Sequence, residues 1–144
     1  MAVTTTMYTT FITAALNKEV DWGSDTIKVA LLDNGHTPDR DAHNYYDDIS
    51  GDEVPNGSGY TTGGATLGSK TITPSGHTVQ FDAANTSWTT STITARYAVV
   101  YGDTGTPATS PLICYIDFGT DQSSSSGTFQ ITWDSTGVTV GTAS

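Results

Sequence analysis

The chain of 144 residues is poor in basic side chains and has a single cysteine, and each shortage excludes a class of protein. Lysine and arginine together number 5 against 15 acidic residues, which gives a formal net charge of −10. Because no basic cluster occurs, direct binding to nucleic acid is not expected. With Cys114 alone no disulfide can form within the chain, so the small secreted domains held together by disulfides are excluded.

Long apolar runs are missing as well. The longest contain four or five residues, whereas a membrane-spanning helix needs about 20. The first ten residues, MAVTTTMYTT, have neither the basic nor the apolar segment of a secretory signal. We therefore expect a soluble chain with no membrane partner, which leaves a cell by lysis or within a particle if it works outside one.

Hydroxyl side chains are abundant, with 28 threonines and 14 serines. Threonine is β-branched and suits a pleated, half-exposed surface, so the composition favours an all-β fold in one domain over residues 1–144. Strand-like patterns cover residues 26–32, 65–73, 77–82, 93–101, 112–118, 128–133 and 138–140. No helical pattern separates these strands, which favours an antiparallel β-sandwich or a jelly-roll-like barrel.

One N-terminal helix is expected over residues 8–20. Apolar residues recur there at helical spacing: Tyr8, Phe11, Ile12, Ala15 and Leu16. Residues 1–7 form a short, threonine-rich arm in front of it. The N-terminal region either packs over one end of the sheet or reaches a neighbouring molecule. In the second case, removing residues 1–6 weakens binding to that neighbour and leaves the domain folded.

A long, acidic, glycine-punctuated loop is expected over residues 33–64. A domain of this size seldom keeps so much irregular chain unless another surface packs on it, which indicates a role in assembly. The arm, the helix and this loop are therefore the expected contact regions. The residues that we expect to make these contacts are Met7, Tyr8, Phe11, Tyr45 and Tyr46.

No spacing in the chain indicates catalysis, and we expect no enzyme activity, cofactor or metal. A calcium loop that begins at Asp39 fails, because Asn44 stands where glycine is required and Ser50 where glutamate is required. A looser Ca²⁺ or Mg²⁺ site in the acidic loop stays open. The three histidines, His36, His43 and His77, do not have the spacing of a zinc site.

Several strand residues have a simple structural interpretation. Cys114, within LICYIDF, is expected to be a buried thiol, and Asp117 an outward-facing acid. Arg96 is expected to pair with an acid such as Asp117 on a neighbouring strand, or with an acid across a subunit interface. Trp88 and Trp133 are expected in the core, which makes a carbohydrate-binding face the weaker interpretation of the aromatic residues.

Four segments in order, TIKVALLDN, TPDRDAHNYYDDI, GYTTGGATL and ITARYAVVYGDTGTPATSPLICYIDFG, resemble a family of small structural proteins of tailed bacteriophages. The resemblance covers roughly residues 26–133. It implies a capsid decoration, or cement, protein on the outer surface of the virion head, assembled in the host cytoplasm. The implied partners are the major capsid protein and further copies of the chain, as in a homotrimer. A neck or tail component and a carbohydrate-binding adhesion module are the alternatives.

Overall fold

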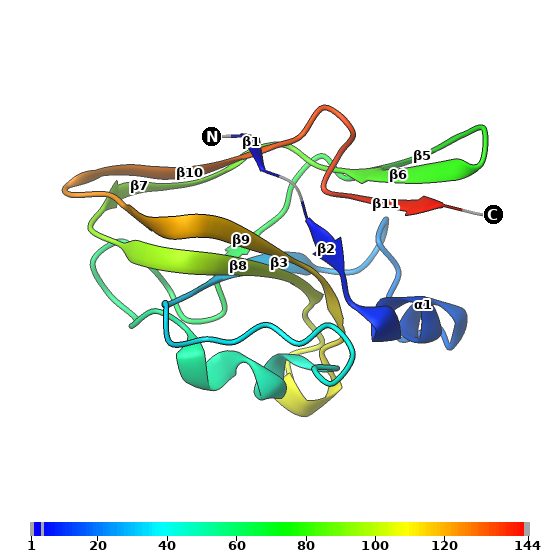
Figure 1. Ribbon diagram of the computed structural model, residues 1–144, viewed down its shortest axis with the longest axis horizontal. Coiled ribbons are helices and arrows are strands. Elements are labelled where there is room, and N and C mark those ends of the chain that lie inside the picture. Colours follow the sequence, from blue (N-terminus) through cyan, green and yellow to red (C-terminus); the bar gives the residue numbers. More distant parts are fainter. Residues whose placement is uncertain (1, 4, 143–144) are drawn as a thin grey trace.

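The computed structural model describes residues 2–3 and 5–142, which form antiparallel sheets packed together with one α-helix (Figure 1). The prediction of an all-β sandwich with one N-terminal helix is confirmed. Three sheets make up the fold, and the only parallel pairing among the described strands joins β1 (Ala2–Val3) to β10 (Gly127–Trp133).

The largest sheet has five strands in the order β2-β9-β8-β3-β4. In that order the strands are Thr6–Met7, Leu112–Ser123, Thr94–Gly102, Ile27–Leu32 and Ala65–Thr66. The central strands β3 and β8 are buried over most of their length, and their side chains divide between two hydrophobic clusters. One cluster contains Val29 and Leu31, and the other contains Ala30 and Leu32, because successive side chains point to opposite faces of a sheet.

Two three-stranded sheets complete the fold. One has the order β1-β10-β7, with β7 at Thr86–Ser91. The other has the order β11-β6-β5, at Thr139–Thr142, Thr78–Asp82 and Thr71–Ser75. Figure 1 shows them end to end along one side of the five-stranded sheet. The main core lies between the layers, and Trp88, Phe129, Ile131 and Trp133 of the β10-β7 pair are buried in it.

The helix is shorter than the expected 8–20. Helix α1 covers Thr9–Leu16 and buries Phe11 and Ala14. Asn17 is its C-cap, and Lys18 has a φ of 62°, which lies in the left-handed region that a right-handed helix cannot include. The helix therefore ends at Leu16, three residues before Glu19.

The N-terminal segment is part of the sheets. Strand β2 pairs with β9, with Thr6 opposite Tyr115 and Met7 opposite Cys114. The Thr5 hydroxyl donates a hydrogen bond of 2.6 Å to the Val138 carbonyl, 133 residues away in sequence. The described residues of the expected arm over residues 1–7 therefore pack on their own domain, which is the first of the two alternatives, and a contact of this arm with a neighbouring molecule stays a prediction.

The irregular segment 33–64 is present, but its packing surface is the domain's own sheet. It contains two 3-10 turns, η1 (Tyr46–Asp48) and η2 (Ser50–Asp52), and a third turn, η3 (Pro107–Thr109), lies in the β8–β9 connection. Tyr46 and Ile49 join the outer cluster of β3, β8 and β9. The segment therefore covers a face that would otherwise be exposed to water.

Gly64 marks the return of this segment to β4. Its φ is 85°, and a Cβ atom there would lie 1.8 Å from the Val29 carbonyl oxygen. Only glycine allows so close an approach between two backbones.

Candidate interaction surface

Four large apolar side chains among the described residues are exposed. They are Ile12 and Leu16, which are 58% and 79% exposed, together with Ile72 and Val140. The first two lie on α1, and the other two lie on the β11-β6-β5 sheet, at the right of Figure 1. Ile12 and Leu16 are four residues apart and share one face of α1. Val140 pairs with Gln80 and Ile72 pairs with Phe81, so Val140 and Ile72 point to opposite faces of their sheet.

A groove of about 590 Å³ runs between α1 and β5 at this end. Its lining contains the apolar residues Phe11, Ala15, Val20, Trp22 and Ile72, together with the polar or charged residues Lys18, Asp21, Ser24 and Asp25. Phe81 of β6 holds the hairpin over the helix, since its ring packs edge-on against Phe11 and Trp22 with centroids 5.7 Å apart in each case. Ile72 is the cross-strand partner of Phe81, so it lies on the face of the hairpin that is turned toward α1. We call α1 together with Ile72 the apolar end.

The predicted contact residues are mostly buried within the domain. Tyr8 is 0% exposed, and Phe11 and Tyr46 are also buried, so these three predictions are wrong as exposed contacts. Met7 and Tyr45 are half-buried. The Tyr45 hydroxyl donates a hydrogen bond of 2.8 Å to Glu19, which ties it to its own chain.

The helical spacing correctly predicted a helix here, but the exposed apolar side chains of that helix are not the ones expected to make contacts. The apolar stripe of α1 is wider than the face that it buries, so Phe11 points into the core while Ile12 and Leu16 point to solvent. The one available signal was that Ile12 and Leu16 form an i, i+4 pair of their own, displaced by one residue from the Phe11 and Ala15 row. Ile72 carried no signal of this kind, because it lies in a polar edge strand.

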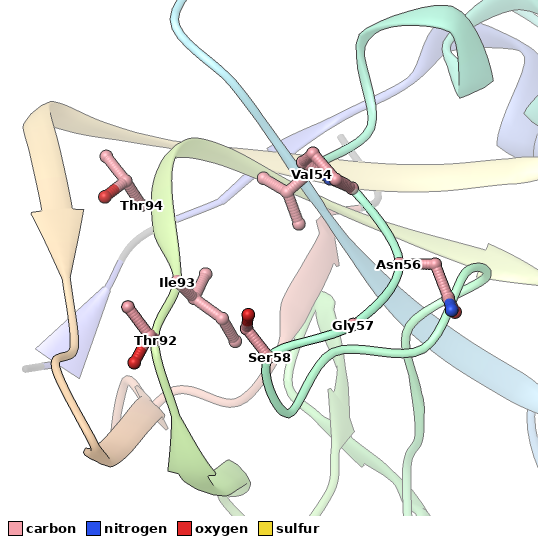
Figure 2. A pocket seen from close by; sticks show the side chains of 8 residues that line it. Val54, Asn56, Gly57, Ser58, Thr92, Ile93 and Thr94 are labelled. Carbon is pink, nitrogen blue, oxygen red and sulfur yellow. The ribbon is translucent and has the colours of Figure 1, made fainter.

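A second hollow, of about 240 Å³, lies between residues 54–58 and 92–94 (Figure 2). Figure 2 shows the side chains of Val54, Asn56, Ser58, Thr92 and Ile93 around it. None of the lining residues is an acid, a base or a thiol. Its lining therefore offers no group that could transfer a proton or act as a strong nucleophile.

The strand residues have the predicted structural roles. Cys114 is fully buried, and burial raises the pKa of its thiol to about 12, so the thiol is protonated and inert at neutral pH. Arg96 Nε lies 2.8 Å from Asp117 Oδ1 on the neighbouring strand, which confirms the pairing within the chain. The hydrogen bond from Arg96 lowers the pKa of the exposed Asp117 carboxyl. Trp88 and Trp133 are buried in the core.

Several acidic side chains of segment 33–64 accept hydrogen bonds from backbone N–H groups of nearby residues in the same segment. Asp39 accepts hydrogen bonds from the backbone N–H groups of Asp41 and Ala42, at 3.1 and 3.0 Å, and these bonds lower the pKa of its carboxyl. Asp48 accepts from Asn44 and Tyr45 in the same way. Within residues 2–3 and 5–142, no group of three or more histidine, cysteine or acidic residues is placed to hold a metal ion.

Glu53 joins this segment to the core. Its carboxylate accepts hydrogen bonds from the hydroxyls of Tyr46 and Tyr60 and, at 2.7 Å, from the backbone N–H of Gly63. The Tyr60 hydroxyl in turn accepts the N–H of Leu31 in β3, at 3.0 Å. Burial, and then the neighbouring carboxylate, raise the pKa of both tyrosines. The arrangement is structural, because each polar group in it forms a hydrogen bond with another group of the same domain.

Comparisons of the chain with protein-family models, with curated proteins and with solved structures found no match. No helix among the described residues has the length and apolar character needed to span a bilayer.

Proposed function

We propose that this chain is a structural virion protein of a tailed bacteriophage, a decoration protein that binds the major capsid protein on the outer surface of the head. The observation that supports the proposal best is the apolar end, because Ile12 and Leu16 of α1 are strongly exposed large apolar side chains on a chain with a formal net charge of −10. The order of sequence segments that resembles small phage structural proteins supports it independently. The proposal assigns the chain a binding role and no enzyme activity.

The energetics suit a protein that is present in many copies. Burying exposed apolar surface stabilises a contact by about 25 cal/mol per Å², so a patch of a few side chains gives modest affinity for each copy. A protein that binds only the assembled shell stabilises that shell by mass action, and a small gain per copy is multiplied over the lattice. Association of the chain into a homo-oligomer, such as a trimer, would multiply the gain again.

Two other locations or roles compete with this one. A neck or tail component would use the same kind of apolar contact in fewer copies. A carbohydrate-binding module needs exposed aromatic rings for stacking on sugars, but Trp22, Trp88 and Trp133 are all buried. Burial of the tryptophans therefore disfavours the carbohydrate role.

The first experiment is to measure the copy number of the chain in purified particles of the phage that encodes it, by quantitative mass spectrometry. We expect a ratio to the major capsid protein near one, or a simple fraction of it. About a dozen copies per particle would place the protein in the neck or tail, and its absence from the particle would overturn the virion role.

A second experiment tests the surface. The double variant Ile12→Ser with Leu16→Ser is expected to bind particles that lack the protein at least tenfold more weakly, because it removes the two most exposed apolar side chains of α1. The matched control, Ile12→Val with Leu16→Met, keeps the surface apolar and should bind as the native chain does. Equal binding by the serine variant would remove the apolar end from the contact.

A further inference from the structure

Two histidine rings come together in segment 33–64, beside β8. His36 is buried at 4% exposure, and His43 is half-buried. Their ring centroids are 5.5 Å apart, and Tyr97 of β8 packs edge-on against His36 at 5.6 Å. Because seven positions separate the two histidines in sequence, the pairing is produced by the fold of the segment and not by a helix or a strand.

Asp52 determines which nitrogen of His36 is available. Its Oδ2 atom lies 2.9 Å from His36 Nδ1. A carboxylate can only accept at this contact, so Nδ1 carries the proton and the neutral ring keeps its lone pair on Nε2. Histidines that bind metal ions are commonly oriented in this way, with the second nitrogen donating to a carboxylate.

The free nitrogens of the two rings are both enclosed. His36 Nε2 and His43 Nδ1 are buried atoms, and neither has a hydrogen-bond partner in the structure. A buried polar atom without a partner is unfavourable, and two in adjacent rings call for one explanation. A cation that accepts both lone pairs provides it.

We propose that His36 Nε2 and His43 Nδ1 are the two protein ligands of a divalent transition-metal ion of the zinc type. Imidazole nitrogen favours zinc, copper and nickel over calcium and magnesium. Two imidazoles on one tetrahedral ion, each with a bond of about 2.0–2.1 Å, have ring centroids roughly 5–6 Å apart, and the observed 5.5 Å falls in that range. With two protein ligands, the site binds an exchangeable ion more weakly than a closed structural zinc site.

A bound ion would fasten the turn at residues 37–43 to the buried His36, and so to the sheet beneath it. The site does not depend on the proposed virion role, because it concerns only how the segment is held in its own domain. The structure also provides a matched control, since the third histidine, His77, is exposed in the turn between β5 and β6.

The test is a calorimetric titration of the full chain with ZnCl₂, made without a histidine tag and treated beforehand with a chelator. We expect one ion per chain and a rise in the midpoint of thermal unfolding. His43→Gln should weaken binding at least tenfold, and His77→Gln should leave it unchanged. His36→Gln should behave as His43→Gln does, and the half-buried position of His43 keeps the test valid if the His36 variant fails to fold.

A spectroscopic measurement identifies the atoms. On addition of zinc, the ¹⁵N resonances of His36 Nε2 and His43 Nδ1 should shift, while those of His77 should not. Asp52→Asn should weaken binding by about 10–100-fold, as expected of a residue that orients a ligand. Absence of saturable binding, or equal binding by the native chain and His43→Gln, would overturn the proposal and leave an ordinary buried histidine pair.

Discussion

Glu53 connects several parts of segment 33–64 to one another through hydrogen bonds to its carboxylate. One carboxylate accepts three donors that come from different parts of the segment, and Tyr60 extends the connection to β3. No sequence pattern indicates this role, because Glu53 follows Asp52 and lies two residues before Pro55 in a stretch without periodicity. Its importance comes from tertiary contacts alone.

We expect Glu53→Gln to lower the free energy of unfolding by about 1–3 kcal/mol, since the amide keeps one acceptor oxygen and leaves a buried donor without a partner. The measurement is the midpoint of urea unfolding. Glu19→Gln is the matched control, because Glu19 accepts a tyrosine hydroxyl, that of Tyr45, on the exposed surface. Its effect should stay within about 0.5 kcal/mol, and an equal effect of the two variants would contradict the role given to Glu53.

At the scale of elements, the strands with strong patterns were predictable and the weak ones were not. The prediction for residues 128–133 matches β10, because apolar and polar residues alternate there. Strand β7 was missed, since TSWTTS contains one large apolar residue, Trp88, and its pairing with β10 supplies the rest of its stability. The N-terminal strands β1 and β2 were missed because two-residue strands have no period to detect.

The position of β2 changes the expected result of an N-terminal deletion. Met7 lies opposite Cys114 in β9, so removal of residues 1–7 uncovers this edge of the sheet. We expect the deletion to lower the thermal midpoint and to make Cys114 react with a thiol reagent much faster than in the native chain. A deletion of residues 1–3, which removes only β1, should leave the thiol protected. A stable, unreactive protein without residues 1–7 would show that β2 does not protect this edge of the sheet.

Across the whole domain, segment 33–64 and the apolar end differ in what covers them. The sequence suggested that segment 33–64 needs a partner, and the structure supplies that partner as the outer face of the domain's own sheet. Length and composition cannot distinguish the two cases, because both leave a long irregular segment in contact with an apolar surface. The apolar end is left as the exposed surface on which the proposed assembly depends. Its residues come from α1 and β5, which are distant in sequence.

Gly64 has a consequence for how variation in this chain is to be interpreted. A single methyl group at this position would collide with the Val29 carbonyl, so each replacement is opposed by the crossing of two backbones. Evolutionary drift at position 64 is therefore blocked whatever the protein binds. If this glycine is invariant among descendants of the chain, the cause is the close backbone approach that folding requires. A search for functional positions by conservation alone would wrongly identify Gly64 as part of a binding site.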